Sequence, residues 1–206
     1  MTTELVGLLP AAGKASRLGI LPCSKEILPV DVIESRTAPG GVRLITAIDY
    51  SLLAFEDAGI RSAFIVVSSV KDDIKSYLDQ SPVARLDLNF DVIDHSPSIV
   101  CSLAQPYPRY RGKNVALLFP DIIFEPRNLL VELERALNSG NADIVLGLMP
   151  TDRGDKMDIV QTDGRDRAIS IRPKPGAGIQ GDTWICLLYS SPSPRDRTHP
   201  LECRRL

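Results

Sequence analysis

Apolar and polar positions along this chain predict strands and helices in alternation. Three short apolar runs have the length and composition of strands buried on both faces, at residues 5–9, 63–67 and 115–119, and residues 143–149 contain a fourth apolar strand. Apolar residues at steps of three and four predict helices at residues 44–58, 71–78, 99–104 and 127–138. Strands that alternate with helices form parallel βαβ units. We therefore expect an α/β fold with helices on both faces of a mostly parallel central sheet.

Two further segments predict strands with one covered face. Residues 86–93 alternate apolar and polar side chains, as expected for a strand with one covered face. Residues 159–160 and 168–171 flank a Thr-Asp-Gly turn, which predicts a β-hairpin.

The end of the chain reads differently from the rest. Residues 186–206 contain three prolines, four arginines and no apolar period, so they predict no helix or strand. This stretch resembles translated vector or sequencing-adapter sequence, and a genuine disordered tail is the alternative. We therefore expect one domain over residues 4–185, followed by a tail that lies outside the fold.

Composition and charge exclude several classes of partner. The net charge of −2 argues against a broad basic face for nucleic acid. No apolar run approaches the roughly 18–20 residues that span a bilayer, and the first residues lack the basic flank of a secretory signal. The four cysteines, at positions 23, 101, 186 and 203, form no Cys-x-x-Cys pair. They indicate free thiols in a cytoplasmic protein rather than disulfides or a zinc site.

The candidate chemistry begins directly after the first apolar run. Small residues there are followed by cations: Ala11, Ala12 and Gly13, then Lys14, Arg17 and Lys25. Small residues let backbone N–H groups face an anion, and cations balance phosphate charge. The dinucleotide fingerprint needs three glycines, and the P-loop needs a Gly-Lys-Ser/Thr end, so neither motif is present. The stretch predicts a nucleotide-phosphate loop, with a surface loop of solvated charges as the alternative.

This stretch also resembles the signature of the sugar-nucleotidyltransferases (nucleoside-diphosphate-sugar pyrophosphorylases). That signature reads roughly G-x-x-x-R-L and, after a short gap, K-x-L-L-P. The matching residues are Gly13, Arg17, Leu18, Lys25, Leu28 and Pro29. The resemblance covers residues 4–185 and implies a three-layer α/β/α, Rossmann-like (GT-A-like) fold with an incomplete sugar-binding part.

The resemblance implies a Mg²⁺-dependent nucleotidyltransferase. Such an enzyme joins a sugar 1-phosphate, or a similar phosphorylated alcohol, to a nucleoside triphosphate and releases pyrophosphate. A non-catalytic nucleotide-binding regulatory or scaffold protein on the same fold is the alternative, because the base-contacting segment is altered and the sugar-binding half is shortened. The sequence leaves a homo-oligomer open.

The resemblance also assigns roles within the loop. Arg17 would hold the triphosphate with its bidentate fork and Lys25 the reacting phosphates. Residues 11–13 and Lys14 would contact the nucleotide. The base-contacting segment of the family contains a glycine, whereas residues 96–101 here contain none; Ser98 is the nucleotide contact expected from it. That difference leaves the choice of base open.

Asp121 is the expected magnesium ligand. It lies just past a buried apolar strand, as Gly13 does, and ligands of parallel sheets bind beyond the carboxyl ends of the strands. Pro120 stands where the family commonly has glycine. The resulting Pro-Asp-Ile segment resembles that of a bacterial subgroup of the family whose substrate is less well defined. A turn or helix-capping aspartate is the alternative.

The sugar-phosphate contact is expected further along the chain. Arg172 and Lys174 give a partial match to the family's Glu-Lys-Pro motif, although neither follows a glutamate. A solvated loop is the alternative there.

Overall fold

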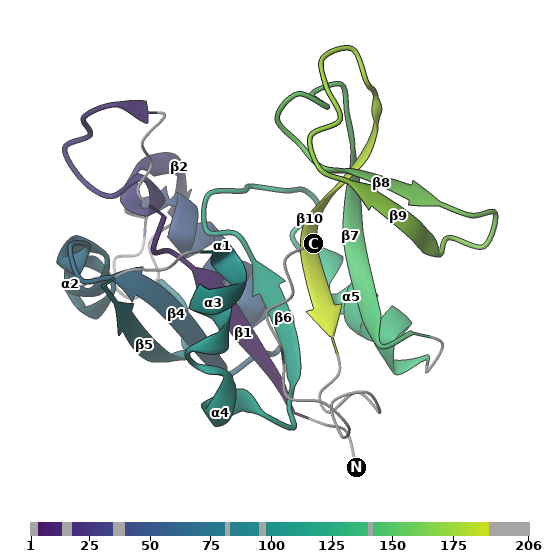
Figure 1. Ribbon diagram of the computed structural model, residues 1–206. Helices are drawn as coiled ribbons and strands as arrows, with labels where there is room; N and C mark the ends of the chain where they lie inside the picture. Colours follow the sequence, from purple (N-terminus) through teal and green to yellow (C-terminus); the bar gives the residue numbers. More distant parts are fainter. Residues whose placement is uncertain are drawn as a thin grey trace.

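A twisted central sheet organises the computed structural model, which describes residues 4–13, 18–34, 40–80, 83–94, 98–139 and 142–189. In this part of the chain eight strands form one sheet, in the order β5-β4-β1-β6-β10-β8-β9, and β7 also pairs with β10 (Figure 1). The strands are β1 (Leu5–Pro10), β4 (Ser62–Ser68), β5 (Asp87–Ile93), β6 (Asn114–Leu118), β7 (Ile144–Thr151), β8 (Ile159–Thr162), β9 (Ala168–Arg172) and β10 (Gly181–Tyr189). Strands β5, β4, β1 and β6 are parallel, whereas β10 runs antiparallel to β6, β7 and β8.

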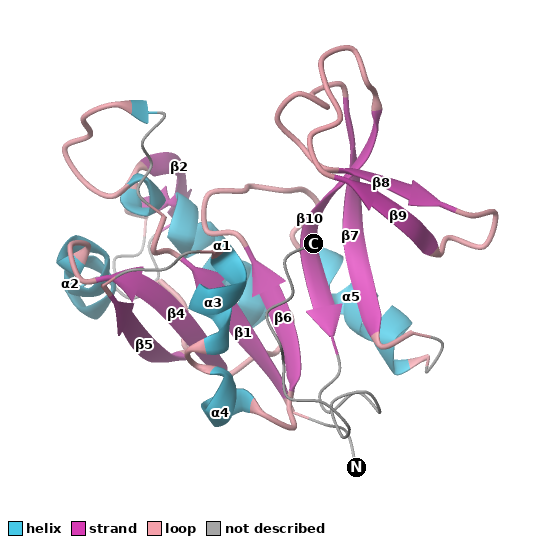
Figure 2. Ribbon diagram, viewed as in Figure 1, coloured by secondary structure: helices cyan, strands magenta, loops and turns pink. Residues whose placement is uncertain are grey.

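Helices cover both faces of this sheet (Figure 2). They are α1 (Ala47–Asp57), α2 (Asp72–Gln80), α3 (Ile99–Ala104), α4 (Tyr107–Tyr110) and α5 (Leu129–Asn138). Leu9 of β1 packs into a core with α1, α2 and α5, whereas Val6 and Leu8 pack on the other face with Tyr110. The expected three-layer α/β/α architecture is therefore confirmed. None of the helices in the described ranges is long and apolar enough to cross a lipid bilayer.

A two-stranded hairpin stands apart from the main sheet. Strands β2 (Pro29–Glu34) and β3 (Val42–Thr46) pair antiparallel with each other. Here the sequence-based prediction of a helix from residue 44 is wrong, because Leu44 lies opposite Val32 in the hairpin with 60% of its surface exposed. The helix begins three residues later, where Thr46 and Asp49 form a capping box: the Asp49 N–H donates to the Thr46 hydroxyl, and the Thr46 N–H donates to the Asp49 carboxylate.

The expected boundary after residue 185 falls inside a central strand. β10 continues to Tyr189, and Cys186 is fully buried opposite Leu118 of β6. The short apolar run at residues 185–188 supplies this part of the strand. The proline- and arginine-rich composition that follows it misled the prediction, and residues 190–206 lie outside the described residues.

Gly7 generates a test of this packing. A Cβ at Gly7 of β1 would stand 2.5 Å from Cε2 of the fully buried Phe55 ring in α1. Gly7→Ala is expected to lower the free energy of unfolding by roughly 1–3 kcal/mol through overpacking, measured by urea denaturation. Phe55→Leu makes room, so the double variant should lose less than the sum of the two single losses. Additive losses would contradict the close contact.

Candidate functional site

Two residues expected in the site meet at the carboxyl edge of the parallel strands. Lys25 lies in a 3₁₀ turn, η2 (Lys25–Ile27), and Asp121 follows the end of β6. The Lys25 ammonium donates to the Asp121 carboxylate across 96 residues of sequence. The two side chains are 23% and 42% exposed, so solvent and small ligands reach the pair. The structure thus brings the expected phosphate-binding cation beside the expected metal ligand.

The segment that carries Asp121 is anchored to β10. The Ile122 N–H donates to the Phe119 carbonyl at 3.0 Å, which closes a turn around Asp121. The Phe119 ring packs edge-on against Trp184 of β10, with 5.2 Å between ring centroids. The aromatic contact fixes the exit of β6, and the turn then leaves the carboxylate of Asp121 exposed.

Two interactions hold the segment that carries Lys25. Glu26 is 1% exposed and accepts hydrogen bonds from the Lys71 ammonium at both carboxylate oxygens, 2.9 Å each. On the other side of Lys25, Asp73 accepts from the Ser24 N–H at 2.6 Å and from the Ser24 hydroxyl at 2.8 Å. Lys71 directly precedes α2, and Asp73 lies in the first turn of this helix. Residues at the start of α2 therefore form hydrogen bonds with the residues on both sides of Lys25.

Hydrogen bonding decides the pKa of Asp73. Burial alone opposes ionisation of this carboxyl and would raise its pKa. The hydrogen bonds from the backbone and hydroxyl of Ser24, joined by the Ile74 N–H, outweigh burial and hold the pKa of Asp73 below its ordinary value of 3.8. Asp73 is therefore the charged acceptor that this contact requires at neutral pH.

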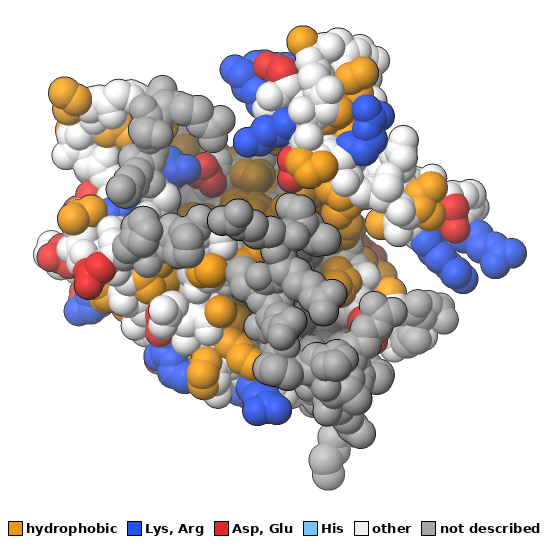
Figure 3. All heavy atoms as spheres, in the orientation of Figure 1, with side chains coloured by type: hydrophobic (Ala, Val, Ile, Leu, Met, Phe, Trp, Pro, Cys, Tyr) orange, Lys and Arg blue, Asp and Glu red, His pale blue; other side chains and the backbone are white. Residues whose placement is uncertain are grey.

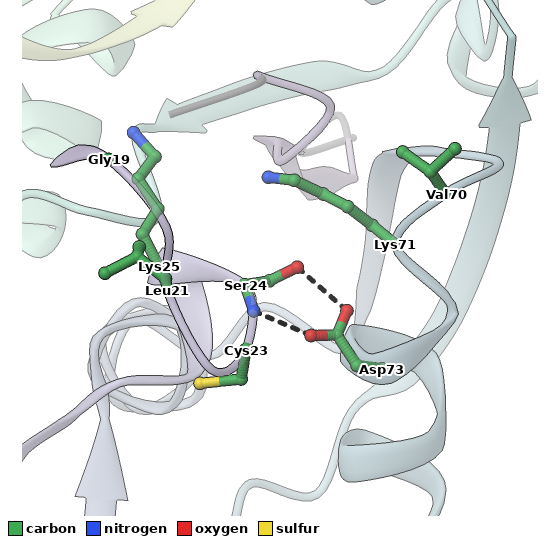
Figure 4. A pocket seen from close by; sticks show the side chains of 8 residues that line it. All are labelled: Gly19, Leu21, Cys23, Ser24, Lys25, Val70, Lys71 and Asp73. Carbon is green, nitrogen blue, oxygen red and sulfur yellow. Dashed lines mark hydrogen bonds between the residues drawn. The ribbon is translucent and has the colours of Figure 1, made fainter. Parts of the chain in front are cut away.

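A pocket of about 280 Å³ opens beside these contacts (Figure 4). Its lining consists of Gly19, Leu21, Cys23, Ser24, Lys25, Val70, Lys71 and Asp73. On the surface, Figure 3 shows a hollow between the region of β2 and the region of β8 and β9, with basic and acidic side chains on its wall. Cys23, Cys101 and Cys186 are free thiols, as the sequence predicts for these three.

We call residues 11–13, which follow β1, the small-residue bend, and its first residue already forms hydrogen bonds within the fold. The Ala11 N–H donates to the Val66 carbonyl at 2.7 Å, and the Ala11 carbonyl accepts from Lys71 at 2.8 Å. The Ala11 N–H, which was expected to contact the nucleotide, is therefore already hydrogen-bonded within the sheet. Ala12 is half-buried and Gly13 exposed, and a Cβ at Gly13 would have no atom within 4 Å. Lys14 and Arg17 lie outside the described residues.

The remaining expected contacts lie on other elements. Ser98 is the N-cap of α3, and its hydroxyl accepts from the Cys101 N–H at 3.3 Å. Arg172 ends β9 opposite Ile159, and Lys174 follows it with a positive φ of 40°. Both cations are exposed on the chain that leaves the β8–β9 hairpin. Neither takes part in the hydrogen bond of Lys25 to Asp121 or in those of Lys71 to Ala11 and Glu26.

Sequence reasoning missed Lys71, Glu26 and Asp73. Lys and Glu ordinarily mark solvated positions, and the Lys71–Glu26 contact joins residues 45 apart in sequence. The available signal was positional: Lys71 follows the carboxyl end of the buried strand β4, at the same sheet edge as the small-residue bend.

The donor set around Asp121 fits only one kind of metal site. Within the described ranges no three histidine, cysteine or acidic side chains group to hold a metal ion. Mg²⁺, however, commonly uses one or two carboxylates and completes its shell with substrate phosphates and water. An exposed carboxylate at the end of a strand, next to the Lys25 ammonium, fits that arrangement, whereas an all-protein cage does not fit.

A second pocket lies where β7 and β10 leave the sheet. It measures about 700 Å³ and is lined by Pro150, Thr151, Asp152, Gln180, Gly181 and Asp182, of which Thr151, Asp152, Gln180 and Asp182 carry polar side chains. Hydroxyl, amide and carboxylate groups together suit a ligand that carries several hydroxyl groups.

Several solved structures share this architecture. A protein described as a glucose-1-phosphate thymidylyltransferase from Bacillus anthracis, in complex with sucrose, superposes with a TM-score of 0.77 at 17% identity, over 96% of this chain and 76% of its own. A UDP-glucose pyrophosphorylase with bound UDP-glucose gives 0.71 at 13% identity, over 91% and 76%. The UTP-bound UDP-glucose pyrophosphorylase of Acinetobacter baumannii gives 0.71 at 17% identity, over 91% and 74%.

The chain has the nucleotidyltransferase fold. No protein-family model and no curated protein sequence matches it. At these identities the likeness concerns the fold alone. The chemistry of the protein therefore has to be argued from the residues at the carboxyl edge of the parallel strands.

The Ser24–Asp73 contact predicts a pH-dependent stability. Because the pKa of Asp73 is lowered on folding, its contribution is complete above the ordinary value of 3.8 and is lost as the pH falls below it. Asp73→Asn is expected to lower the free energy of unfolding by about 1–2 kcal/mol at pH 7, and the difference from wild type should shrink below pH 4. Urea titrations across this range measure it. A constant difference at all pH values would rule out the charged contact.

Proposed function

We propose that this protein is a nucleotidyltransferase that joins a sugar 1-phosphate, or a similar phosphorylated alcohol, to a nucleoside triphosphate and releases pyrophosphate. The observation that carries the proposal is the meeting of Lys25 and Asp121 at the carboxyl edge of a sheet with the nucleotidyltransferase fold. The solved structures of this fold include complexes with UTP, UDP-glucose and sucrose, which supports a nucleoside triphosphate and a sugar derivative as the substrate classes.

The chemical problem is repulsion between two anions. A phosphate oxygen of the sugar phosphate attacks the α-phosphorus of the triphosphate, the bond to the β-phosphate oxygen breaks, and pyrophosphate leaves. Little covalent assistance is needed from the protein, so positioning and neutralisation of charge dominate. Lys25 supplies a compact charge beside the reacting phosphates, and Arg17 a planar fork for the departing pyrophosphate.

Asp121 is the proposed metal ligand. Mg²⁺ held by this carboxylate, phosphate oxygens and water would supply additional positive charge to the triphosphate. In the structure the Lys25 ammonium neutralises Asp121. The ion pair therefore holds the carboxylate in place at the site.

The sugar phosphate has its own candidate contacts. The larger pocket offers Thr151, Asp152 and Gln180 to the hydroxyl groups of a sugar. Arg172 and Lys174 remain the proposed cations for its phosphate. Asp182 of the same pocket lies in β10, opposite Val160 of the hairpin that carries Arg172, so strand pairing links the two features.

A coupled assay of pyrophosphate release tests the proposal. Wild-type protein with Mg²⁺ is expected to release pyrophosphate from at least one combination of nucleoside triphosphate and sugar 1-phosphate. Lys25→Ala, Arg17→Ala and Asp121→Asn should each lower kcat on the order of 10²–10³-fold, as the loss of one stabilising charge does. Circular dichroism checks that each variant folds.

Lys75→Ala is the matched control, because Lys75 forms an exposed ion pair with Asp79 on α2. It should leave turnover unchanged. Wild-type-like turnover of a variant would remove that residue from the mechanism, and no pyrophosphate from any substrate pair would refute the function.

Gly13 tests the nucleotide contact separately from chemistry. A Cβ at Gly13 meets no atom within 4 Å, so Gly13→Ala should keep the stability of the wild type. A backbone that approaches phosphates closely would lose affinity, with Kd raised by about tenfold or more, measured by calorimetry with the preferred triphosphate. Gly164→Ala, in the distant β8–β9 turn and equally unhindered, is the control that should not change Kd. Unchanged affinity in Gly13→Ala would exclude the bend as a phosphate contact.

A further inference from the structure

A buried lysine outside the expected site ties together three segments that meet at Lys25. The Lys71 ammonium donates to the Ala11 carbonyl at 2.8 Å and to both oxygens of Glu26 at 2.9 Å. Ala11 follows β1, Glu26 lies in η2, and Lys71 directly precedes α2. We call this set of contacts the Lys71 bridge. Lys71 and Glu26 are 8% and 1% exposed, so the bridge is shielded from water.

The ammonium of Lys71 has no donor left for a substrate. A lysine ammonium carries three N–H donors and no acceptor. The Ala11 carbonyl and the two Glu26 oxygens provide three acceptors within hydrogen-bond distance. Lys71 also lines the 280 Å³ pocket, yet its charge is already balanced by Glu26. Any influence of Lys71 on bound phosphates must therefore pass through another residue.

That residue is Lys25. Its chain neighbours on both sides are held, Ser24 by Asp73 and Glu26 by Lys71, so the backbone at Lys25 is fixed at two points. We propose that Lys71 is a positioning residue for Lys25, aiming its ammonium at Asp121 and at the phosphates bound there. The catalytic part of this inference rests on the proposed function, whereas the hold on the segment does not.

Stability alone gives a weaker account of the bridge. Desolvation of two buried charges offsets much of their attraction, so well-packed apolar residues usually replace such a pair without loss. What apolar residues would not reproduce is the directed contact to a carbonyl at the exit of β1 and to a carboxylate next to Lys25. Placement of the segment is what the bridge specifically provides.

The test removes the bridge without leaving a lone buried charge. The variant Lys71→Met/Glu26→Gln is expected to keep a cooperative unfolding transition. Its kcat should fall on the order of 10²-fold, as for a small misplacement of a catalytic group, with the KM for the triphosphate changed by less than about threefold. In a Lys25→Ala background the same two changes should lower kcat by no more than about twofold, because their target is already gone.

The matched control neutralises an exposed pair on the same helix. Lys75→Met/Asp79→Asn should change kcat in neither background. An equal loss of kcat from the Lys71→Met/Glu26→Gln variant with and without Lys25 would show a general structural effect and would overturn the proposal. Unchanged kcat in the folded variant would overturn it as well.

The rate of thiol labelling tests, without any enzyme assay, whether the Lys71 bridge fixes the segment that carries Lys25. Cys23 is half-buried and lies two residues from Lys25. Its reaction with an aromatic disulfide reagent is followed in a Cys101→Ser/Cys203→Ser background. Loss of the bridge should raise the labelling rate of Cys23 by about tenfold, because local opening becomes easier. An unchanged rate in folded protein would overturn the positioning role. Absence of pyrophosphate release by wild type, with faster labelling in the variant, would refute the proposed function alone.

Discussion

An ammonium group removed from water constrains the whole carboxyl edge of this sheet. A buried charge is tolerated only when acceptors surround it, and at Lys71 those acceptors come from two other segments, the exit of β1 and η2. If any of the three segments moved away, a buried charge or carbonyl would lose its hydrogen-bond partner. The small-residue bend, the turn that carries Lys25 and the start of α2 are therefore tied to one another before any ligand arrives.

The parallel strands bring the remaining parts of the site to the same place. β1, β4 and β6 end at one edge, so residues that follow them in sequence meet there although they lie far apart along the chain. The aromatic pair of Phe119 and Trp184 then sets the exit of β6 against β10. The frame thus places the Lys25 ammonium beside the Asp121 carboxylate.

Sequence patterns predict this frame well where burial leaves a period. Runs buried on both faces, such as residues 115–119, are apolar throughout, and α5 shows an apolar stripe through Leu130, Leu133 and Leu137. The prediction failed at Leu44, because its spacing continues the helical register although the residue faces solvent in a hairpin. It also failed at residue 186, where composition concealed the end of β10.

Sequence patterns likewise predict some residues of the site and miss others. Lys25 and Asp121 were predicted, because a motif and a strand end mark them, and the structure joins them. The Lys71 bridge leaves no comparable mark, since it pairs side chains that sequence reasoning assigns to the surface and depends on their tertiary approach. The roles of Lys25 and Asp121 in binding phosphate and metal stay predictions, as do those of Arg17 and Lys14, which lie outside the described part of the chain.

The position of β10 has a consequence for how the protein is made. It is the last strand of the described chain, yet it lies between β6 and β8 in the sheet and also pairs with β7. On the ribosome, β6 and β7 emerge earlier and expose unpaired backbone edges until residues 181–189 follow. Unpaired edges recruit strands from other chains. The interval before β10 is synthesised is therefore the period in which a nascent chain is most exposed to association with its neighbours.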